Sequence, residues 1–196
     1  MCSLALLRYP ASAGDPDGYR RLVALGVCLL FDTRAERLLR DLWDRLESNG
    51  IRTLRSHTHG AHHPHLSYVV MLRWDLDDVW AAVDALPDRG AFDVTFDAVA
   101  SFPRGRTGLV PTMTPDLLAR QQAVLESVRA TGALVHRHYE VGHWLPHCSV
   151  APRVRLDQLP SVAGAAHDVL PLTARVDRAA LIESGTGELW PLAVVP

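Results

Sequence analysis

Two short segments of the sequence carry residue types that can move protons around a phosphate group. Pro64-His65-Leu66-Ser67 and Pro146-His147-Cys148-Ser149 share the pattern Pro-His-x-Ser and lie 82 residues apart. A neutral imidazole accepts a proton near neutral pH, an imidazolium donates one, and a serine hydroxyl can donate a hydrogen bond to an anionic oxygen. Two such segments in one cleft would suit acid–base cleavage of a phosphodiester without a metal ion.

Strand alternation predicts how the side chains of these two motifs point. Side chains two positions apart on a strand share a face, so His65 and Ser67 point the same way. By the same rule His147 and Ser149 share a face, and Cys148 points into the core. We therefore expect the histidines to divide the acid and base roles, in an order that the sequence leaves open, and the serines to bind the phosphoryl oxygens.

The elements around the first motif form a strand–helix–strand–helix–strand unit over about residues 22–100. Thr33 and Glu36 are spaced as a capping box at the start of the first helix, and Trp43 and Trp80 fall on apolar helix stripes that predict core positions. The expected elements are strands over 22–31, 65–73 and 92–100, a helix from Asp32 to a stop at Gly50, and a helix over 75–87.

The same order of elements recurs 82 residues later, over about residues 107–183. Residues 1–20 are expected to form an N-terminal arm and 184–196 a C-terminal strand. The prediction for the 196-residue chain is therefore a single bilobal α+β domain with a pseudo-two-fold axis. The elements expected in the second unit are a helix from Thr114–Pro115 to Gly132, strands over 147–155 and 172–182, and a helix over 157–169.

The composition of the chain excludes several kinds of catalytic site. All 20 basic residues are arginine, which excludes a Schiff-base lysine and a P-loop lysine. The longest uncharged apolar run, 22–31, has ten residues where a membrane helix needs about twenty, and the first eight residues lack the pattern of a signal peptide. Three cysteines without Cys-x-x-Cys spacing favour a cytoplasmic protein. The net charge of −2 indicates that any phosphate binding is local.

On these motifs the sequence resembles the 2H phosphoesterases, which include bacterial 2′-5′ RNA ligase-like proteins and cyclic phosphodiesterases. Residues 144–147 and 102–106 are also similar to segments of that family. The resemblance implies a bilobal fold in which two antiparallel sheets line a central cleft, with helices outside. It also implies metal-independent, cofactor-free action on RNA ends or small nucleotides with a 2′,3′-cyclic phosphate or a 2′-5′ linkage, including ligase-like activity, and no obligate protein partner.

Four further residues near the motifs are candidates for contacts in the cleft: Tyr139, His143, Trp144 and Arg106. Arg106 can neutralise a phosphate, and Trp144 can stack on a base. Each also has an ordinary structural interpretation, because an exposed arginine is usually solvated and an aromatic side chain before a strand usually packs in the core.

Two alternatives to an acid–base phosphodiesterase stay open. The first is a non-catalytic module that binds RNA or nucleotides in the same cleft. The second is a metal-dependent hydrolase, because imidazoles at close spacing can bind zinc. Its ligands would come from the cluster His57, His59, His62, His63 and His65.

Overall fold

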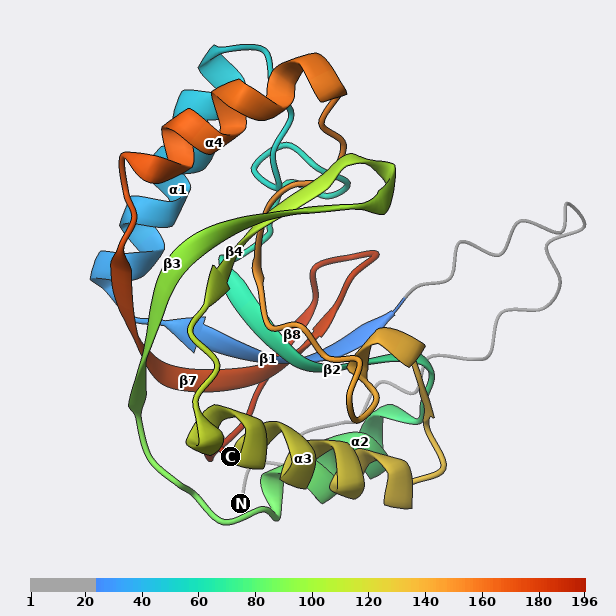
Figure 1. Ribbon diagram of the computed structural model, residues 1–196. Coiled ribbons are helices and arrows are strands. Elements are labelled where there is room, and N and C mark those ends of the chain that lie inside the picture. The colour runs from blue at the N-terminus through green and yellow to red at the C-terminus, as the bar shows by residue number, and fades with distance from the viewer. Residues whose placement is uncertain (1–23) are drawn as a thin grey trace, which may run out of the picture.

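The strands and helices of the chain form a mixed α+β structure in which every strand pair is antiparallel (Figure 1). The structure is a computed structural model that describes residues 24–196. The strands are β1 Leu25–Phe31, β2 His65–Arg73, β3 Phe92–Phe102, β4 Arg106–Pro111, β5 Leu134–Val135, β6 Cys148–Ala151, β7 Leu172–Glu183 and β8 Leu189–Pro191. The α-helices are α1 Thr33–Ser48, α2 Leu76–Asp84, α3 Pro115–Ala130 and α4 Leu159–His167, and short 3₁₀ turns lie at 103–105, 137–139 and 156–158.

Helices α1 and α3 begin and end in the same way. The side chains of Asp32 and Thr114 each accept a hydrogen bond from the N–H three residues on, at 2.7 and 3.1 Å. Both helices are followed by a glycine at positive φ, Gly50 at 73° and Gly132 at 79°. The expected starts and stops are confirmed. The expected capping box does not form, because the carboxylate of Glu36 turns to other partners near the motifs.

The strands join into one continuous sheet with the order β1-β2-β6-β4-β3-β7-β8, and β1 also pairs with β7. Strands β2, β1 and β7 make one half of it, and β6, β4 and β3 make the other. The two expected sheets are hydrogen-bonded to each other through β2–β6 and β3–β7. Helices α1 and α4 lie side by side on one side of this sheet and α2 and α3 on the other, so that all four helices are on the outside (Figure 1).

The two strand pairs that join the halves have a common feature. Leu66 is the partner of Cys148 in β2–β6, and Asp93 is the partner of Arg175 in β3–β7. The residues of each pair lie 82 positions apart, which is the offset of the sequence repeat. Pairing between corresponding residues is what a two-fold axis through both junctions requires, and it supports the interpretation of a duplicated unit.

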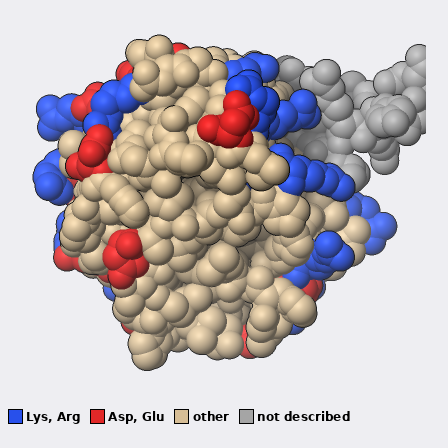
Figure 2. All heavy atoms as spheres, turned by 45° about the horizontal axis from the view of Figure 1, so that its top comes forward, with Lys and Arg blue, Asp and Glu red and all other residues tan. Residues whose placement is uncertain are grey.

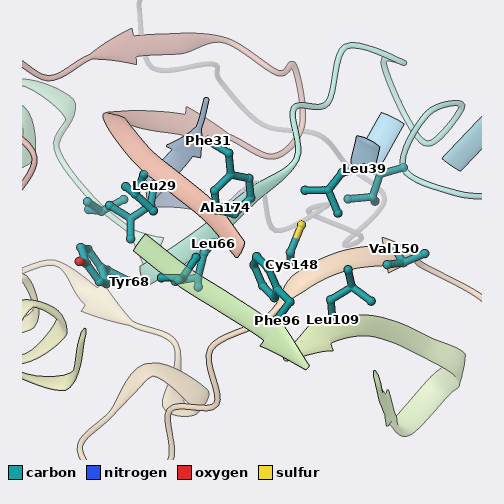
Figure 3. Close-up of a cluster of buried hydrophobic side chains, with 14 of the residues drawn as sticks. Leu29, Phe31, Leu39, Leu66, Tyr68, Phe96, Leu109, Cys148, Val150 and Ala174 are labelled. Atoms are coloured by element: carbon teal, nitrogen blue, oxygen red, sulfur yellow. The ribbon is translucent and has the colours of Figure 1, made fainter. Parts of the chain in front are cut away.

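Apolar side chains from both halves fill the space between the sheet and the helices. Leu66 and Tyr68 of β2 and Cys148 and Val150 of β6 are at most 2 % exposed and lie in one cluster (Figure 3). The two tryptophans expected in the core differ. Trp43 is fully buried, but Trp80 is 41 % exposed, and its indole N–H donates to the carbonyl of Pro191 at the end of β8.

The two ends of the chain are expected to form an arm and a strand. The expected N-terminal arm over 1–20 lies outside the described residues, and the expected strand over 184–196 is limited to β8. Between residues 24 and 196, no helix combines the length and apolar character needed to cross a membrane. On the face shown in Figure 2, charged side chains lie mainly around the edge, and every basic one is arginine because the chain has no lysine.

Candidate active site

The two Pro-His-x-Ser motifs meet where β2 pairs with β6. The register places Leu66 of the first motif opposite Cys148 of the second. Continuation of this antiparallel register by one residue on either side would place the histidine of each motif across from the serine of the other. Side chains directly opposite on one face have Cβ atoms roughly 5 Å apart. The ladder therefore brings two imidazoles and two hydroxyls together: His65, Ser67, His147 and Ser149.

Burial agrees with the expected alternation along both motifs. Leu66 and Cys148 are 0 % and 1 % exposed and point into the core (Figure 3). The histidines and serines on either side of them are all only half-buried. These four polar side chains therefore lie on the opposite face of the sheet, where a ligand can reach them.

Backbone carbonyls hold both histidine rings in the same way. Nδ1 of His65 lies 2.7 Å from the carbonyl oxygen of His63, and Nδ1 of His147 lies 2.9 Å from that of Leu145. A carbonyl can only accept, so Nδ1 carries a proton in both rings. This leaves Nε2 as the nitrogen that can exchange a proton with a ligand.

The environment of His147 favours the neutral imidazole. Burial lowers its pKa, and the positive charges of His65, Arg106 and His138 lower it further, against the hydrogen bond to the Leu145 carbonyl. Phe102 at the end of β3 packs on this ring, with ring centroids 4.8 Å apart. At neutral pH His147 is therefore suited to accept a proton.

The environment of His65 acts in the other direction. Burial lowers its pKa, but the sulfur of Cys28 and the His63 carbonyl outweigh this and raise it from 6.5 to about 9. At neutral pH His65 is therefore suited to donate a proton. The two histidines are equivalent in the sequence pattern, and their surroundings make them unequal.

Cys28 is the site residue that the sequence analysis missed. It lies on β1 opposite Ser67, just after a β-bulge, and it is 2 % exposed. Its Sγ is 3.6 Å from the Ser67 hydroxyl oxygen. On the other half, Gly108 of β4 is the partner of Ser149. A Cβ on that glycine would lie 2.9 Å from a carbonyl oxygen of β6 and 3.4 Å from Cδ2 of His147, so the glycine lets the ring lie close to the sheet.

Two of the four predicted cleft contacts, both aromatic, reach Ser67. Burial raises the pKa of Tyr139 to about 12, and the neighbouring Ser67 side chain acts in the opposite direction. The indole N–H of Trp144 donates to the backbone carbonyl of Ser67 at 3.1 Å. Since Trp144 is only 8 % exposed and packs beside Tyr68, it supports the strand from the core and is not open to a base.

The other two predicted contacts, Arg106 and His143, lie on the rim. Arg106 is the exposed first residue of β4, and its charge lowers the pKa of His57, His136 and His147, after burial in each case. His143 is exposed on the segment that leads to His147. The charge that surrounds the motifs is therefore positive, which favours an anionic ligand.

The histidine cluster of residues 57–63 precedes the first motif as a loop. The ring of His62 lies 5.9 Å from that of His57 and 4.1 Å from that of His59, centroid to centroid, and burial with these neighbouring charges lowers the pKa of His62 to about 4. His63 turns away and its Nδ1 lies 3.1 Å from the Glu36 carboxylate. Within the described part of the chain, no three histidine, cysteine or acidic side chains are grouped so that they could hold a metal ion. The alternative of a metal site in this loop gains no support from the geometry.

Comparison with known proteins agrees with this geometry. E. coli LigT in its apo form has 11 % sequence identity and a TM-score of 0.61, covering 87 % of this chain and 94 % of LigT. A crystal structure described as a phosphoesterase has 12 % identity and a TM-score of 0.56, with 87 % and 95 % covered. E. coli LigT in complex with 3′-AMP has 11 % identity and a TM-score of 0.55, with 87 % and 94 % covered. At these identities the likeness concerns the fold.

A search of curated proteins found no match. The sequence profile of the 2′-5′ RNA ligase superfamily matches residues 35–188, which include both motifs and most of the chain. This match confirms the family that the two motifs indicated: the chain belongs to the 2′-5′ RNA ligase superfamily, a group of 2H phosphoesterases.

Proposed function

We propose that this chain is a metal-independent phosphodiesterase that acts on 2′,3′-cyclic phosphates or 2′-5′ linkages at nucleotide or RNA ends. The observation that supports the proposal is the Leu66–Cys148 pairing, because the histidine and serine of each motif flank the paired residues and are half-buried. Membership of the superfamily supports it. Nucleotide ligands are consistent with the LigT structures, which were solved with 3′-AMP and with NADP+.

The two histidines take opposite roles in the proposed reaction. Nε2 of His147 accepts a proton from a water molecule as the water oxygen attacks phosphorus. The bond from phosphorus to one ribose oxygen breaks, and Nε2–H of His65 donates a proton to that leaving oxygen. One proton is taken up and one is released, and each transfer contributes on the order of 10²–10⁴ in rate. A ribose hydroxyl in place of water would give the ligase-like reaction with the same two transfers.

The serines bind the phosphate while the protons move. The hydroxyls of Ser67 and Ser149 donate hydrogen bonds to the nonbridging oxygens, which gain negative charge as the attack proceeds. With each serine across from the other motif's histidine, as continuation of the Leu66–Cys148 register favours, the phosphorus would be held between the two rings. Cys28 contacts the Ser67 hydroxyl and helps to position it, with Tyr139 nearby.

The test is hydrolysis of 2′,3′-cyclic mononucleotides and 2′-5′ dinucleotides, with the products identified by chromatography. His65→Ala and His147→Ala should each lower kcat by about 10²-fold or more. His167→Ala, which removes an exposed histidine from the end of α4, is the matched control and should leave kcat unchanged. Full activity in the His65→Ala, His147→Ala double variant would refute the proposal.

The same assay separates the two alternatives. Tight binding of the cyclic nucleotide without product after long incubation would indicate a non-catalytic binding module. A chelator such as EDTA should have no effect on the proposed reaction. Stoichiometric zinc in tag-free protein, together with loss of activity on chelation, would instead favour the metal-dependent hydrolase.

A further inference from the structure

A hollow of about 530 Å³ lies along the segment that precedes the second motif and is not used by the proposed reaction. It is formed by the 3₁₀ turn over 137–139 and the segment that runs from it to the second motif. The same turn carries Tyr139, which is close enough to Ser67 for that side chain to lower its pKa, so the turn connects the hollow to the first motif. The lining residues are Arg129, Arg137, His138, Glu140, Val141 and His143.

Of the charged and histidine side chains that line this hollow, two form an ion pair with each other and three have no partner among residues 24–196. Arg129 forms an ion pair with Glu140, so their charges cancel. Arg137, His138 and His143 are exposed, and among residues 24–196 their side chains take part in no hydrogen bond or ion pair. A guanidinium and two imidazoles are therefore free to bind a ligand, and a guanidinium fits a phosphate through two parallel hydrogen bonds.

The charge in the hollow is positive and continuous with the charge around the motifs. Burial lowers the pKa of neighbouring His136, and the charges of His138, Arg137 and Arg106 lower it further. His138 and Arg106 act on His147 in the same sense. Mutual repulsion among these groups is relieved when an anion binds between them. A volume of about 530 Å³ lies within the range of roughly 300–1,000 Å³ that is typical of small-ligand sites, which is enough for a nucleotide.

We propose that this hollow binds a second phosphate, carried by the nucleotide next to the reacting phosphate, with Arg137 as its main ligand. The inference rests on the proposed function and narrows its substrate to an oligonucleotide end or dinucleotide with at least two phosphates. A phosphate is favoured over a free carboxylate because the hollow adjoins the proposed phosphate site, and a nucleotide chain continues from one phosphate to the next.

The experiment compares three substrates that end in a 2′,3′-cyclic phosphate. They are a cyclic mononucleotide, a dinucleotide with an ordinary internal phosphate, and the same dinucleotide with an uncharged methylphosphonate linkage. The wild-type protein should show at least a ten-fold higher kcat/KM for the charged dinucleotide than for the other two. Equal kcat/KM values for the charged and uncharged dinucleotides would overturn the inference, because the second phosphate would then contribute nothing.

Arg137→Ala tests the residue assignment. This variant should remove most of the preference for the charged dinucleotide, and log kcat/KM should depend on log salt concentration with a slope smaller by about 0.7, the value for one lost contact to a single strand. Arg45→Ala is the matched control, since Arg45 lies on the outside of α1 and pairs with Asp168. An Arg137→Ala variant that keeps the preference and the slope would contradict the assignment.

Failure of the second-phosphate inference can be distinguished from failure of the proposed phosphodiesterase function. If no substrate is turned over, the phosphodiesterase proposal fails, and the hollow is tested by calorimetric titration with a dinucleotide 3′-phosphate. Binding that is weakened in Arg137→Ala but not in Arg45→Ala would support the hollow as a phosphate site. Equal affinity in both variants and the wild type would refute it.

Discussion

Replacing Cys28 with alanine tests whether the buried sulfur, through its negative charge and its hydrogen bond, keeps His65 protonated. The sulfur and the His63 carbonyl raise the pKa of His65 to about 9, while burial alone acts to lower it from 6.5. When the sulfur is removed, the effect of burial gains weight against the single hydrogen bond to the carbonyl. We therefore expect the pKa of His65 in the Cys28→Ala variant to fall to about 6.5 or below.

The size of the effect follows from the protonated fraction of the general acid. A group with a pKa of about 9 is ~90 % protonated at pH 8, and a group with a pKa of about 6.5 is ~3 % protonated. Because the acid must be protonated to act, kcat/KM at pH 8 should fall about 30-fold. At pH 6 both forms are mostly protonated, so kcat/KM should fall less than about two-fold. The basic limb of the pH profile therefore moves down by roughly 2.5 pH units.

The assay is the pH dependence of kcat/KM for a 2′,3′-cyclic mononucleotide between pH 5 and 10. Cys28→Ser keeps a polar atom beside Ser67 but has no ionisable thiol, so it should shift the basic limb as alanine does. Cys148→Ala is the matched control, because this thiol is equally buried but points into the core and is not a cause of the raised pKa of His65. It should cost stability and leave the limb in place. A Cys28→Ala variant whose basic limb stays near pH 9 would refute the reasoning.

Two further variants test the supports of the site. The Glu36 carboxylate contacts the ring of His63, and the carbonyl of His63 orients the ring of His65. Glu36→Gln should therefore lower kcat about five-fold, equivalent to about 1 kcal/mol, with little change in KM. An unchanged kcat would show that this contact does not position the ring of His65. Gly105 has a positive φ, and a Cβ at this position would clash with the carbonyl oxygen of Val154. Gly105→Ala should therefore lower the free energy of unfolding, measured by urea titration, by about 3 kcal/mol. A loss below about 1 kcal/mol would contradict the close approach of Gly105 to Val154.

Local signals in the sequence predict much of the fold. The expected strand over 65–73 has the same bounds as β2, and the caps and glycine stops define α1 and α3. The strand expected over 147–155 is shorter, because β6 ends at Ala151. The following residue, Pro152, has no N–H to donate to the ladder, which favours a strand end at this point. The expected bounds are longer because they follow the repeat pattern. The single continuous sheet depends on pairing between distant strands, which no local pattern encodes.

The candidate site shows the same division between local and distant information. Alternation along each motif predicts the shared face of its histidine and serine, and the structure has it. The position of Cys28 could not be predicted, because the repeat offset aligns Gly26, not Cys28, with Gly108. The β-bulge before Cys28 shifts the register and places the thiol opposite Ser67. A bulge of this kind is a property of the paired strands and leaves no mark in a repeat at fixed spacing.

The departures from two-fold symmetry are what suit the site to acid–base chemistry. Two equivalent histidines would carry the proton with equal probability, but the proposed reaction needs a neutral ring at one defined position and a protonated ring at the other. The bulge puts a thiol beside His65, whereas the corresponding place near His147 is occupied by Gly108. Arg106 adds a positive charge on the His147 side, and the repeat offset aligns it with Ala24, which has no charge. Both differences separate the two pKa values in the same sense, so a duplicated scaffold with these substitutions would supply the base and the acid of the proposed reaction from one repeated motif.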